Sequence, residues 1–320
     1  MKLVRYSAHG STPRLGSLVG DEVRCLGETY HRHLQARGVT RAGELAHALF
    51  PPSARAFFQA GAAADDALHA MDDAVRAGRL QWVTHPLPQV TLHAPLHDPE
   101  KFLCIGLNYL DHAEETGSPI PKEPPVFAKF PNAVVDSRAK IVRPRGSEKL
   151  DYEVELGFVV SRTAKDVSQE RALDYIWGYV LVNDVSARDF QMATSQWMAG
   201  KICDTFAPMG PWIADRSEVP DPHVLQLQTW VNGTQLQNGN SKNLIYNINV
   251  LVAYLSAHLT LAPGDLVITG TPAGVGFTRK PPVLLKGGDR VQMEITGLGR
   301  LDNTVVEALR TRSGSLLGSP

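Results

Sequence analysis

The chain has 320 residues, of which 43% are hydrophobic and 20% charged, and its 32 basic and 33 acidic residues leave a net charge of −1 at pH 7. This composition is ordinary for a globular protein, and the length is sufficient for one large domain and a small one. Because the charge is balanced, it provides no electrostatic basis for binding nucleic acid or an anionic membrane surface, and we expect neither as a partner.

Cysteine usage and the apolar segments exclude further classes. Cys25, Cys104 and Cys203 are widely spaced and odd in number, which argues against a disulfide framework or a zinc knuckle. The first residues lack the apolar core of a signal peptide. No apolar run approaches the roughly 18 residues that span a bilayer. We therefore expect a cytoplasmic protein, or a protein of the mitochondrial matrix if the source is eukaryotic.

Residues 1–95 are expected to form a small N-terminal α/β domain. Apolar patterns predict strands at 2–6 and 22–26 and helices at 41–49 and 63–77. The segment Asp98-Pro99-Glu100 then interrupts regular structure. Proline and its neighbours disfavour helix and strand interiors, so we place the domain boundary between residues 95 and 96.

Residues 96–320 are expected to form a larger domain dominated by short strands that Gly and Pro interrupt. Strand patterns occur at 101–105, 126–130, 225–231, 265–269 and 290–295, and helical patterns at 110–116, 169–172 and 244–259. Strands outnumber helices, and the alternation of strand and helix that builds a doubly wound sheet is missing. The predicted fold class is α+β and mostly β.

Three acids recur at every second residue in the segment that begins at Asp151. In an extended strand Asp151, Glu153 and Glu155 share one face, because alternate side chains point the same way. Such a stripe can be the hydrated face of a half-buried strand. Alternatively it is a site for a hard divalent cation, which prefers carboxylate oxygens. The apolar run 156–160 indicates a strand buried on both faces and favours the cation.

A second strand candidate supports the metal site. The apolar segment 178–182 runs directly into Asn183 and Asp184, which places an acid at the end of a buried strand. Glu153, Glu155 and Asp184 together would leave coordination positions for water and substrate, as a catalytic Mg²⁺ requires.

A histidine and a glutamate lie three residues apart where the chain is predicted to turn helical. His112 and Glu115 then share one helix face, and the carboxylate can orient the imidazole as a general base. The alternative is an exposed helix whose polar side chains are solvated. The following Gly-Ser-Pro-Ile-Pro segment cannot continue the helix, so this region is a candidate for a mobile lid.

Two cations and a glycine-rich loop complete the candidate site. Arg188 and Lys201 follow Asp184 closely, where they are suited to hold a substrate carboxylate or a developing enolate, or else they are solvated surface residues. The loop 269–277 lacks the Gly-Lys-Ser/Thr of a phosphate-binding loop and does not open a helix as a dinucleotide fingerprint does. It is either a place where backbone approaches a ligand or a tight turn.

In combination these segments resemble the fumarylacetoacetate hydrolase (FAH) family, and within it the FAH domain-containing protein 2 type. The resemblance covers roughly residues 100–308, and residues 1–95 are similar to the small N-terminal domain of longer members. The motifs that carry it, in family order, are Gly106-Leu107-Asn108-Tyr109 with His112 and Glu115, Glu153-Val154-Glu155, 183–191, 201–206, Asn238-Gly239-Asn240 and 269–276.

The resemblance implies a mixed β-sandwich roll, usually a homodimer, with defined site residues. The ligands of Mg²⁺ or Mn²⁺, which Ca²⁺ can replace in a crystal, would be Glu153, Glu155 and Asp184. His112 and Glu115 match a dyad that activates water from a mobile lid, and Lys201 matches a lysine that stabilises an enolate or oxyanion. Asp151 falls outside the ligand set, so it would lie behind the ligands or be exposed.

The resemblance also implies a substrate pocket and a reaction. The residues that match substrate-binding positions are Tyr109, Lys129, Arg188, Gln191 and Thr271. The expected reaction is hydrolysis of a carbon–carbon bond in a 1,3-dicarbonyl 2-oxo acid, such as an acylpyruvate or a fumarylpyruvate-like compound, in catabolism of aromatic or sugar-acid compounds. A decarboxylase or isomerase of 2-oxo diacids would use the same site without an attacking water. A non-catalytic metal-binding protein is the third alternative.

Overall fold

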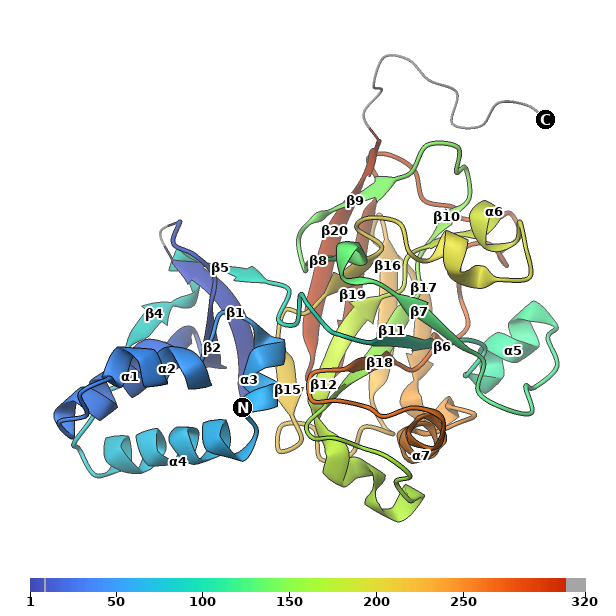
Figure 1. Ribbon diagram of the computed structural model, residues 1–320. Coiled ribbons are helices and arrows are strands. Elements are labelled where there is room, and N and C mark those ends of the chain that lie inside the picture. Colours follow the sequence, from blue (N-terminus) through green and yellow to red (C-terminus); the bar gives the residue numbers. More distant parts are fainter. Residues whose placement is uncertain (9, 309–320) are drawn as a thin grey trace, which may run out of the picture.

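The computed structural model describes residues 1–8 and 10–308, which form two lobes side by side (Figure 1). The N-terminal lobe contains β1 (Lys2–Ala8), β2 (Arg14–Val19), β3 (Glu22–Cys25), α1 (Leu26–Ala36), α2 (Ala42–Leu49), α3 (Ala54–Ala60), α4 (Ala62–Arg76), β4 (Thr84–Pro86), η1 (Leu87–Gln89) and β5 (Val90–His93). The predicted domain boundary at residue 95 lies in the connection that follows β5.

The second lobe holds the remaining strands and helices. They are β6 (Phe102–Ile105), α5 (Leu110–Thr116), β7 (Val126–Lys129), η2 (Pro131–Ala133), β8 (Val134–Asp136), β9 (Lys140–Arg143), β10 (Leu150–Asp151), β11 (Val154–Val160), η3 (Gln169–Tyr175), β12 (Ile176–Asn183), β13 (Ser186–Ala187), α6 (Arg188–Gln191), η4 (Trp197–Gly200), β14 (Ala207–Met209), β15 (Ile213–Asp215), β16 (Gln226–Val231), β17 (Thr234–Asn240), η5 (Ser241–Asn243), α7 (Ile248–His258), β18 (Leu266–Ile268), β19 (Arg290–Ile295) and β20 (Gly299–Glu307). The fold is mixed α+β, as predicted.

Two sheets form the core of the second lobe. The larger sheet has the order β4-β3-β2-β1-β15-β12-β11-β18-β6-β7, with β5, β8 and β14 beside this path, and the smaller sheet has the order β17-β16-β19-β20-β9. The central strands β11 and β12 pack against β16, β19 and β20 of the smaller sheet. Every residue of β11 is buried, which confirms that this strand is covered on both faces.

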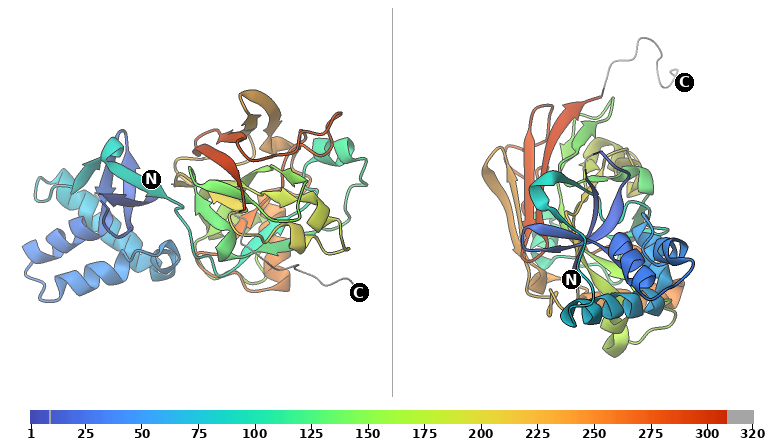
Figure 2. Two further views of the ribbon diagram at one scale, coloured as in Figure 1. Left: turned by 90° about the horizontal axis from the view of Figure 1, so that it is seen from above. Right: turned by 90° about the vertical axis from the view of Figure 1, so that its left-hand side faces the viewer.

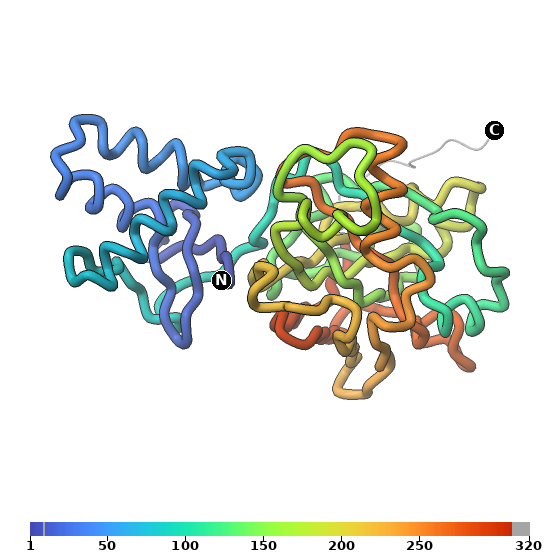
Figure 3. Tube along the Cα trace, turned by 90° about the horizontal axis from the view of Figure 1, so that it is seen from below, coloured from blue at the N-terminus to red at the C-terminus, as the bar shows by residue number. Residues whose placement is uncertain are grey.

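The two lobes are joined by backbone pairing and by side chains. β1 pairs with β15, so the larger sheet passes from one lobe to the other. The views from above and below show the two lobes side by side (Figures 2 and 3). Phe58 of α3 packs on Trp177 of β12 with ring centroids 5.1 Å apart. The Ser7 hydroxyl lies 2.9 Å from His93 Nε2, and His93 Nδ1 lies 3.0 Å from Asp136 of the second lobe.

One prediction about the acidic stripe is corrected. The segment from Asp151 to Val160 is not one continuous strand, because Tyr152 and Glu153 separate β10 from β11. Side-chain acceptors take the backbone N–H groups there: Tyr152 donates to the Asp151 carboxylate and Glu153 donates to the Asn183 side chain. These bonds replace ladder bonds and end the pairing of β10 with β13.

The predicted helices with a strong apolar pattern are present, but some helix boundaries differ from the predicted ones. The helices predicted at 41–49 and 63–77 are α2 and α4, but α1, α3 and β2 were missed. The helix predicted from residue 244 starts at Ile248, because the Asn247 side chain accepts a hydrogen bond from Val250 and caps it. No helix in the described residues is long and apolar enough to cross a membrane.

The aromatic contact between the lobes gives the first testable prediction. Phe58 is 2% exposed, so Phe58→Ala should lower the free energy of unfolding by about 3–5 kcal/mol through lost burial and a cavity. Leu45→Ala is the control, since Leu45 is 46% exposed. Differential scanning fluorimetry measures the change in Tm. Equal melting temperatures for the two variants would show that this contact does not stabilise the fold.

Candidate active site

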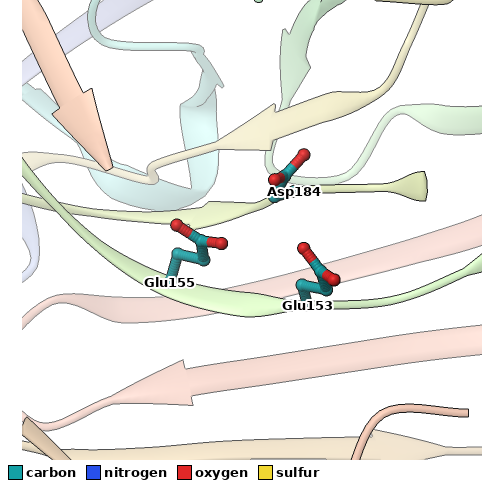
Figure 4. A group of neighbouring side chains, drawn as sticks. All are labelled: Glu153, Glu155 and Asp184. Carbon is teal, nitrogen blue, oxygen red and sulfur yellow. The ribbon is translucent and has the colours of Figure 1, made fainter. Parts of the chain in front are cut away.

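Strand register brings three carboxylates together. β11 pairs antiparallel with β12, with Val154 opposite Asn183, so Glu153 lies opposite Asp184 just beyond the ladder. Glu155 is two residues further along the same face. Carboxylate oxygens of all three residues lie within 4.8 Å of one another (Figure 4). The predicted ligand set therefore forms one cluster, and it is buried.

Buried cations neutralise two of these acids. Lys201 Nζ lies 2.6 Å from Glu153 Oε2 and 2.8 Å from Asp184 Oδ2, and Arg188 lies 2.7 Å from Glu153 Oε1. Lys129 Nζ lies 2.7 Å from Asp184 Oδ1. Burial opposes ionisation of Glu153, but Lys201 and Arg188 outweigh it and hold the pKa of this carboxyl far below its usual range.

Glu155 differs because no Lys or Arg among the described residues forms an ion pair with it. Its Oε2 accepts a hydrogen bond of 2.7 Å from the Gly270 backbone N–H. Burial, and then the charges of Asp184 and Glu153, raise the pKa of Glu155 well above its usual range. Gly270 can approach this closely because its φ is +93° and a Cβ would crowd Asn108.

The donor set fits a hard divalent cation. Three carboxylates supply only oxygen ligands, which suits Mg²⁺ or Mn²⁺ rather than a thiophilic metal. The absence of a cationic partner for Glu155 among the described residues is the observation that favours a bound cation, because ionising a buried carboxyl group without such a partner is costly. Glu153, Glu155 and Asp184 are the residues that would hold it.

The predicted dyad also forms. His112 Nδ1 lies 3.2 Å from Glu115 Oε2 on α5. Burial opposes ionisation of Glu115, but hydrogen bonds from His112, Thr278 and the Gly274 backbone outweigh it and lower its pKa. An ionised carboxylate only accepts hydrogen bonds, so in the neutral imidazole Nδ1 carries the proton. The other nitrogen, Nε2, is left with a lone pair that can take a proton.

Glu153, Glu155, Lys201, Arg188 and His112 line one cavity of about 230 Å³. Asp184 is fully buried and reaches this group through its ion pair with Lys201. Gln191 and Thr271, both predicted to bind substrate, line it as well. The rest of the wall contains apolar and aromatic side chains, namely Ile105, Leu107, Phe127, Met192, Trp197 and Phe277. The cavity thus has a charged end suited to an acid group and an apolar side.

Three residues lie behind the cavity. Tyr109 is fully buried, and Lys129 donates to the carbonyls of Val185, Lys201 and Phe206. Neither residue is among those that line the cavity, so their predicted substrate contacts stay a prediction. Asp151 is 0% exposed and accepts from Arg188 Nε at 2.9 Å. It therefore lies behind the ligands, and the alternative of an exposed Asp151 is wrong.

The sequence alone indicated no individual role in the site for Asn108 or Phe127. Asn108 donates to the carbonyls of Thr269 and Tyr246 and fixes the chain that enters α5. Phe127 and Trp197 form an edge-to-face pair in the cavity wall, with centroids 6.0 Å apart. Their contacts join segments far apart in the chain, so no local pattern indicates them.

The unequal partners of Glu153 and Glu155 give the second prediction. Glu155→Gln should abolish tight Mn²⁺ binding in isothermal titration calorimetry yet leave the Tm in EDTA unchanged or higher, because it removes a buried carboxyl group that has no cationic partner. Glu153→Gln is the matched variant. It leaves Lys201 and Arg188 with fewer partners and should cost about 3 kcal/mol of stability without metal. Equal Tm losses in EDTA would contradict this charge distribution.

Comparisons with known proteins identify the family of this chain. The family model described as fumarylacetoacetate (FAA) hydrolase C-terminal matches residues 101–306. The Xenopus laevis protein "Oxaloacetate tautomerase fahd2, mitochondrial" is 45% identical over 219 residues, which cover 68% of this chain and 69% of that protein. The fumarylacetoacetate hydrolase domain-containing protein 2 homolog of Dictyostelium discoideum is 48% identical over 231 residues, covering 69% and 75%.

Solved structures share the fold across both lobes. Maleylpyruvate hydrolase from Sphingobium sp. SYK-6, solved with manganese(II) ion and pyruvate, superposes with a TM-score of 0.72 at 27% identity, over 97% of this chain and all of that chain. The neighbours and relatives include a hydrolase and a tautomerase. The match over residues 101–306, together with the identities above, shows that this chain belongs to the fumarylacetoacetate hydrolase family.

Proposed function

We propose that this protein is a divalent-metal-dependent enzyme that interconverts the keto and enol forms of a 2-oxo diacid of the oxaloacetate type. The observation that carries the proposal is one cavity lined by two glutamates of the buried acidic triad, by two buried cations and by an oriented histidine. One of these glutamates, Glu155, has no cationic partner among the described residues. The relative with 45% identity is named for this reaction, whereas the maleylpyruvate hydrolase is 27% identical.

The residues of the chain supply a base and stabilising charge. His112 Nε2 takes the proton from the carbon next to the keto group, and Glu115 steadies the imidazolium that results. Negative charge then develops on the keto oxygen, and the Lys201 ammonium is placed to donate to it. The imidazolium of His112 then returns its proton to this oxygen, so the C–H bond broken is replaced by an O–H bond and His112 is neutral again.

Arg188 and Gln191 orient the acid group. Arg188 is held by Asp151 and Glu153 and donates to Gln191 Oε1 at 3.0 Å. This network fixes the guanidinium and presents the Gln191 amide to the cavity. A divalent cation on the triad would add the charge that binds a 2-oxo acid and lowers the energy of its enolate.

Hydrolysis of a carbon–carbon bond in an acylpyruvate is the second candidate. The apolar side of the cavity, with the Phe127–Trp197 pair, suits an acyl chain better than a second carboxylate. In this reaction His112 would remove a proton from water, which attacks the distal carbonyl, and the enolate of pyruvate would leave. Both reactions need the same charge on the enolate oxygen.

Product analysis separates the two reactions. We expect the protein with Mn²⁺ or Mg²⁺ to accelerate the loss of enol-oxaloacetate, followed by its ultraviolet absorbance, with no pyruvate formed. Acetylpyruvate, assayed in parallel with lactate dehydrogenase as the pyruvate detector, should be cleaved slowly or not at all. Rapid cleavage of acetylpyruvate without tautomerisation would replace the first proposal with the second.

Two variants test the residue roles. His112→Ala should lower kcat at least 100-fold because it removes the base, within the usual range for general base catalysis. Its Mn²⁺ affinity should be unchanged, since His112 is not a ligand. Glu153→Ala should lose both metal binding and turnover. Retained turnover in Glu153→Ala would exclude the triad as the metal site.

A homodimer is proposed for this chain. β7 is one of the two end strands in the main order of the larger sheet in the described residues. Val126 of β7 and the adjacent Phe130 are exposed apolar residues, as are Leu110 and Ile120 in the segment that precedes β7. An apolar sheet edge favours association. Light scattering after gel filtration should give about twice the 34.9 kDa of one chain. A monomer mass at micromolar concentration would contradict the proposal.

A further inference from the structure

The loop Gly274–Thr278, which follows β18, donates hydrogen bonds to the carboxylate oxygen of Glu115 that does not face His112. Glu115 Oε1 accepts a hydrogen bond of 2.7 Å from the Thr278 hydroxyl and one of 3.0 Å from the Gly274 backbone N–H. Glu115 Oε2 faces His112 Nδ1. Both oxygens of one carboxylate are therefore used, one for the histidine and one for the loop.

The Thr278 hydroxyl has two possible hydrogen-bond acceptors, and the carboxylate of Glu115 is the favoured one. Its hydroxyl lies 2.7 Å from Glu115 Oε1 and 2.9 Å from the Val275 carbonyl, and a hydroxyl has a single proton to donate. The shorter distance and the negative charge of the carboxylate make the bond to Glu115 the stronger one. The hydroxyl therefore binds a residue of α5 and does not only stabilise the turn in which it lies.

The loop itself is held rigidly. The Gly274 carbonyl accepts from the Tyr152 hydroxyl and from Arg279 Nε. A Cβ at Gly274 would lie 2.1 Å from the Leu236 carbonyl oxygen, so no side chain fits there. Two backbone N–H groups, of Gly276 and Phe277, donate to Asp151 at 2.8 and 3.1 Å.

Asp151 connects this loop to the triad. Its carboxylate also binds Arg188, which in turn binds Glu153. A continuous set of hydrogen bonds thus runs from Glu153 through Arg188 and Asp151 to the loop, and from the loop through Glu115 to His112. The two halves of the site, the acids and the base, are positioned by the same five-residue loop, Gly274–Thr278.

We propose that Thr278 is a positioning residue, which through Glu115 holds α5 against the loop Gly274–Thr278 and sets the orientation of His112. The inference rests on the proposed function for the role of His112, but the contact to α5 does not depend on which reaction follows. Other polar contacts of this region point elsewhere: Tyr246 donates to the Pro121 carbonyl and Tyr254 to Glu123. They hold the segment after α5 and not the dyad.

Thr278→Val tests the proposal, because valine keeps the shape of threonine and removes the hydroxyl. We expect kcat to fall about tenfold or more while KM changes much less, since a misplaced base affects the reaction and not substrate binding. Loss of a donor raises the pKa of Glu115 relative to the wild type. The carboxylate is then ionised only at higher pH, so the acidic limb of the pH–rate profile should shift upward.

Two further variants act as controls. Thr278→Ser keeps the hydroxyl and should recover at least half of the wild-type kcat, which separates the hydrogen bond from packing of the methyl group. Thr234→Val makes the same chemical change at an exposed threonine on β17 and should leave kcat, KM and the pH profile unchanged.

Hydrogen–deuterium exchange supplies a readout that does not need turnover. In Thr278→Val with Mn²⁺, amides of α5 should exchange about tenfold faster than in the wild type, while Mn²⁺ affinity stays the same. If the wild type turns over neither substrate but α5 still loosens, the positioning role stands and the proposed function fails. Unchanged exchange of α5 together with unchanged kcat would overturn the inference.

Discussion

The concentration of negative charge between β11 and β12 is the constraint on which the rest of the site depends. Three carboxylates within 4.8 Å would repel strongly in a buried place. Three buried cations, Lys129, Arg188 and Lys201, offset this repulsion, and each forms an ion pair with an acid of the cluster. Removing one partner of any of these pairs would leave an uncompensated buried charge, so the stability of the site depends on all three cations.

Sequence periodicity predicted the centre of the site and little of its surroundings. Glu153 and Glu155 share a face because the strand repeat is two residues, and Asp184 joins them because it ends the adjacent strand. Both facts are local, so they can be inferred from the sequence. The role of Asp151 depends on Gly276 and Phe277, more than 120 residues away, and the contact of Glu115 with Thr278 spans 163 residues. Contacts of this kind leave no local pattern.

The fold also divides into features that follow from local sequence and features that depend on contacts between distant residues. Strongly periodic helices such as α2 and α4 were predicted, whereas the start of α7 depends on Asn247 as a cap and on bonds from residues 245 and 246 to Asn108. The break between β10 and β11 depends on the Asn183 side chain. In both places a side chain replaces a backbone partner, and alternation of apolar residues contains no information about that exchange.

Charge balance connects the metal site to Glu155. Asp151, Glu153, Glu155 and Asp184 provide four carboxyl groups against the three cations Lys129, Arg188 and Lys201. Glu155 is the one without a cationic partner among the described residues, and its pKa is raised well above its usual range by burial and by the charges of Asp184 and Glu153. A divalent cation on the triad would supply the missing positive charge and favour the ionised form of Glu155. The same balance explains why Lys201 remains protonated, since burial alone would lower its pKa but Asp184 and Glu153 raise it. An ammonium kept charged in this way can stabilise an enolate oxygen throughout the reaction.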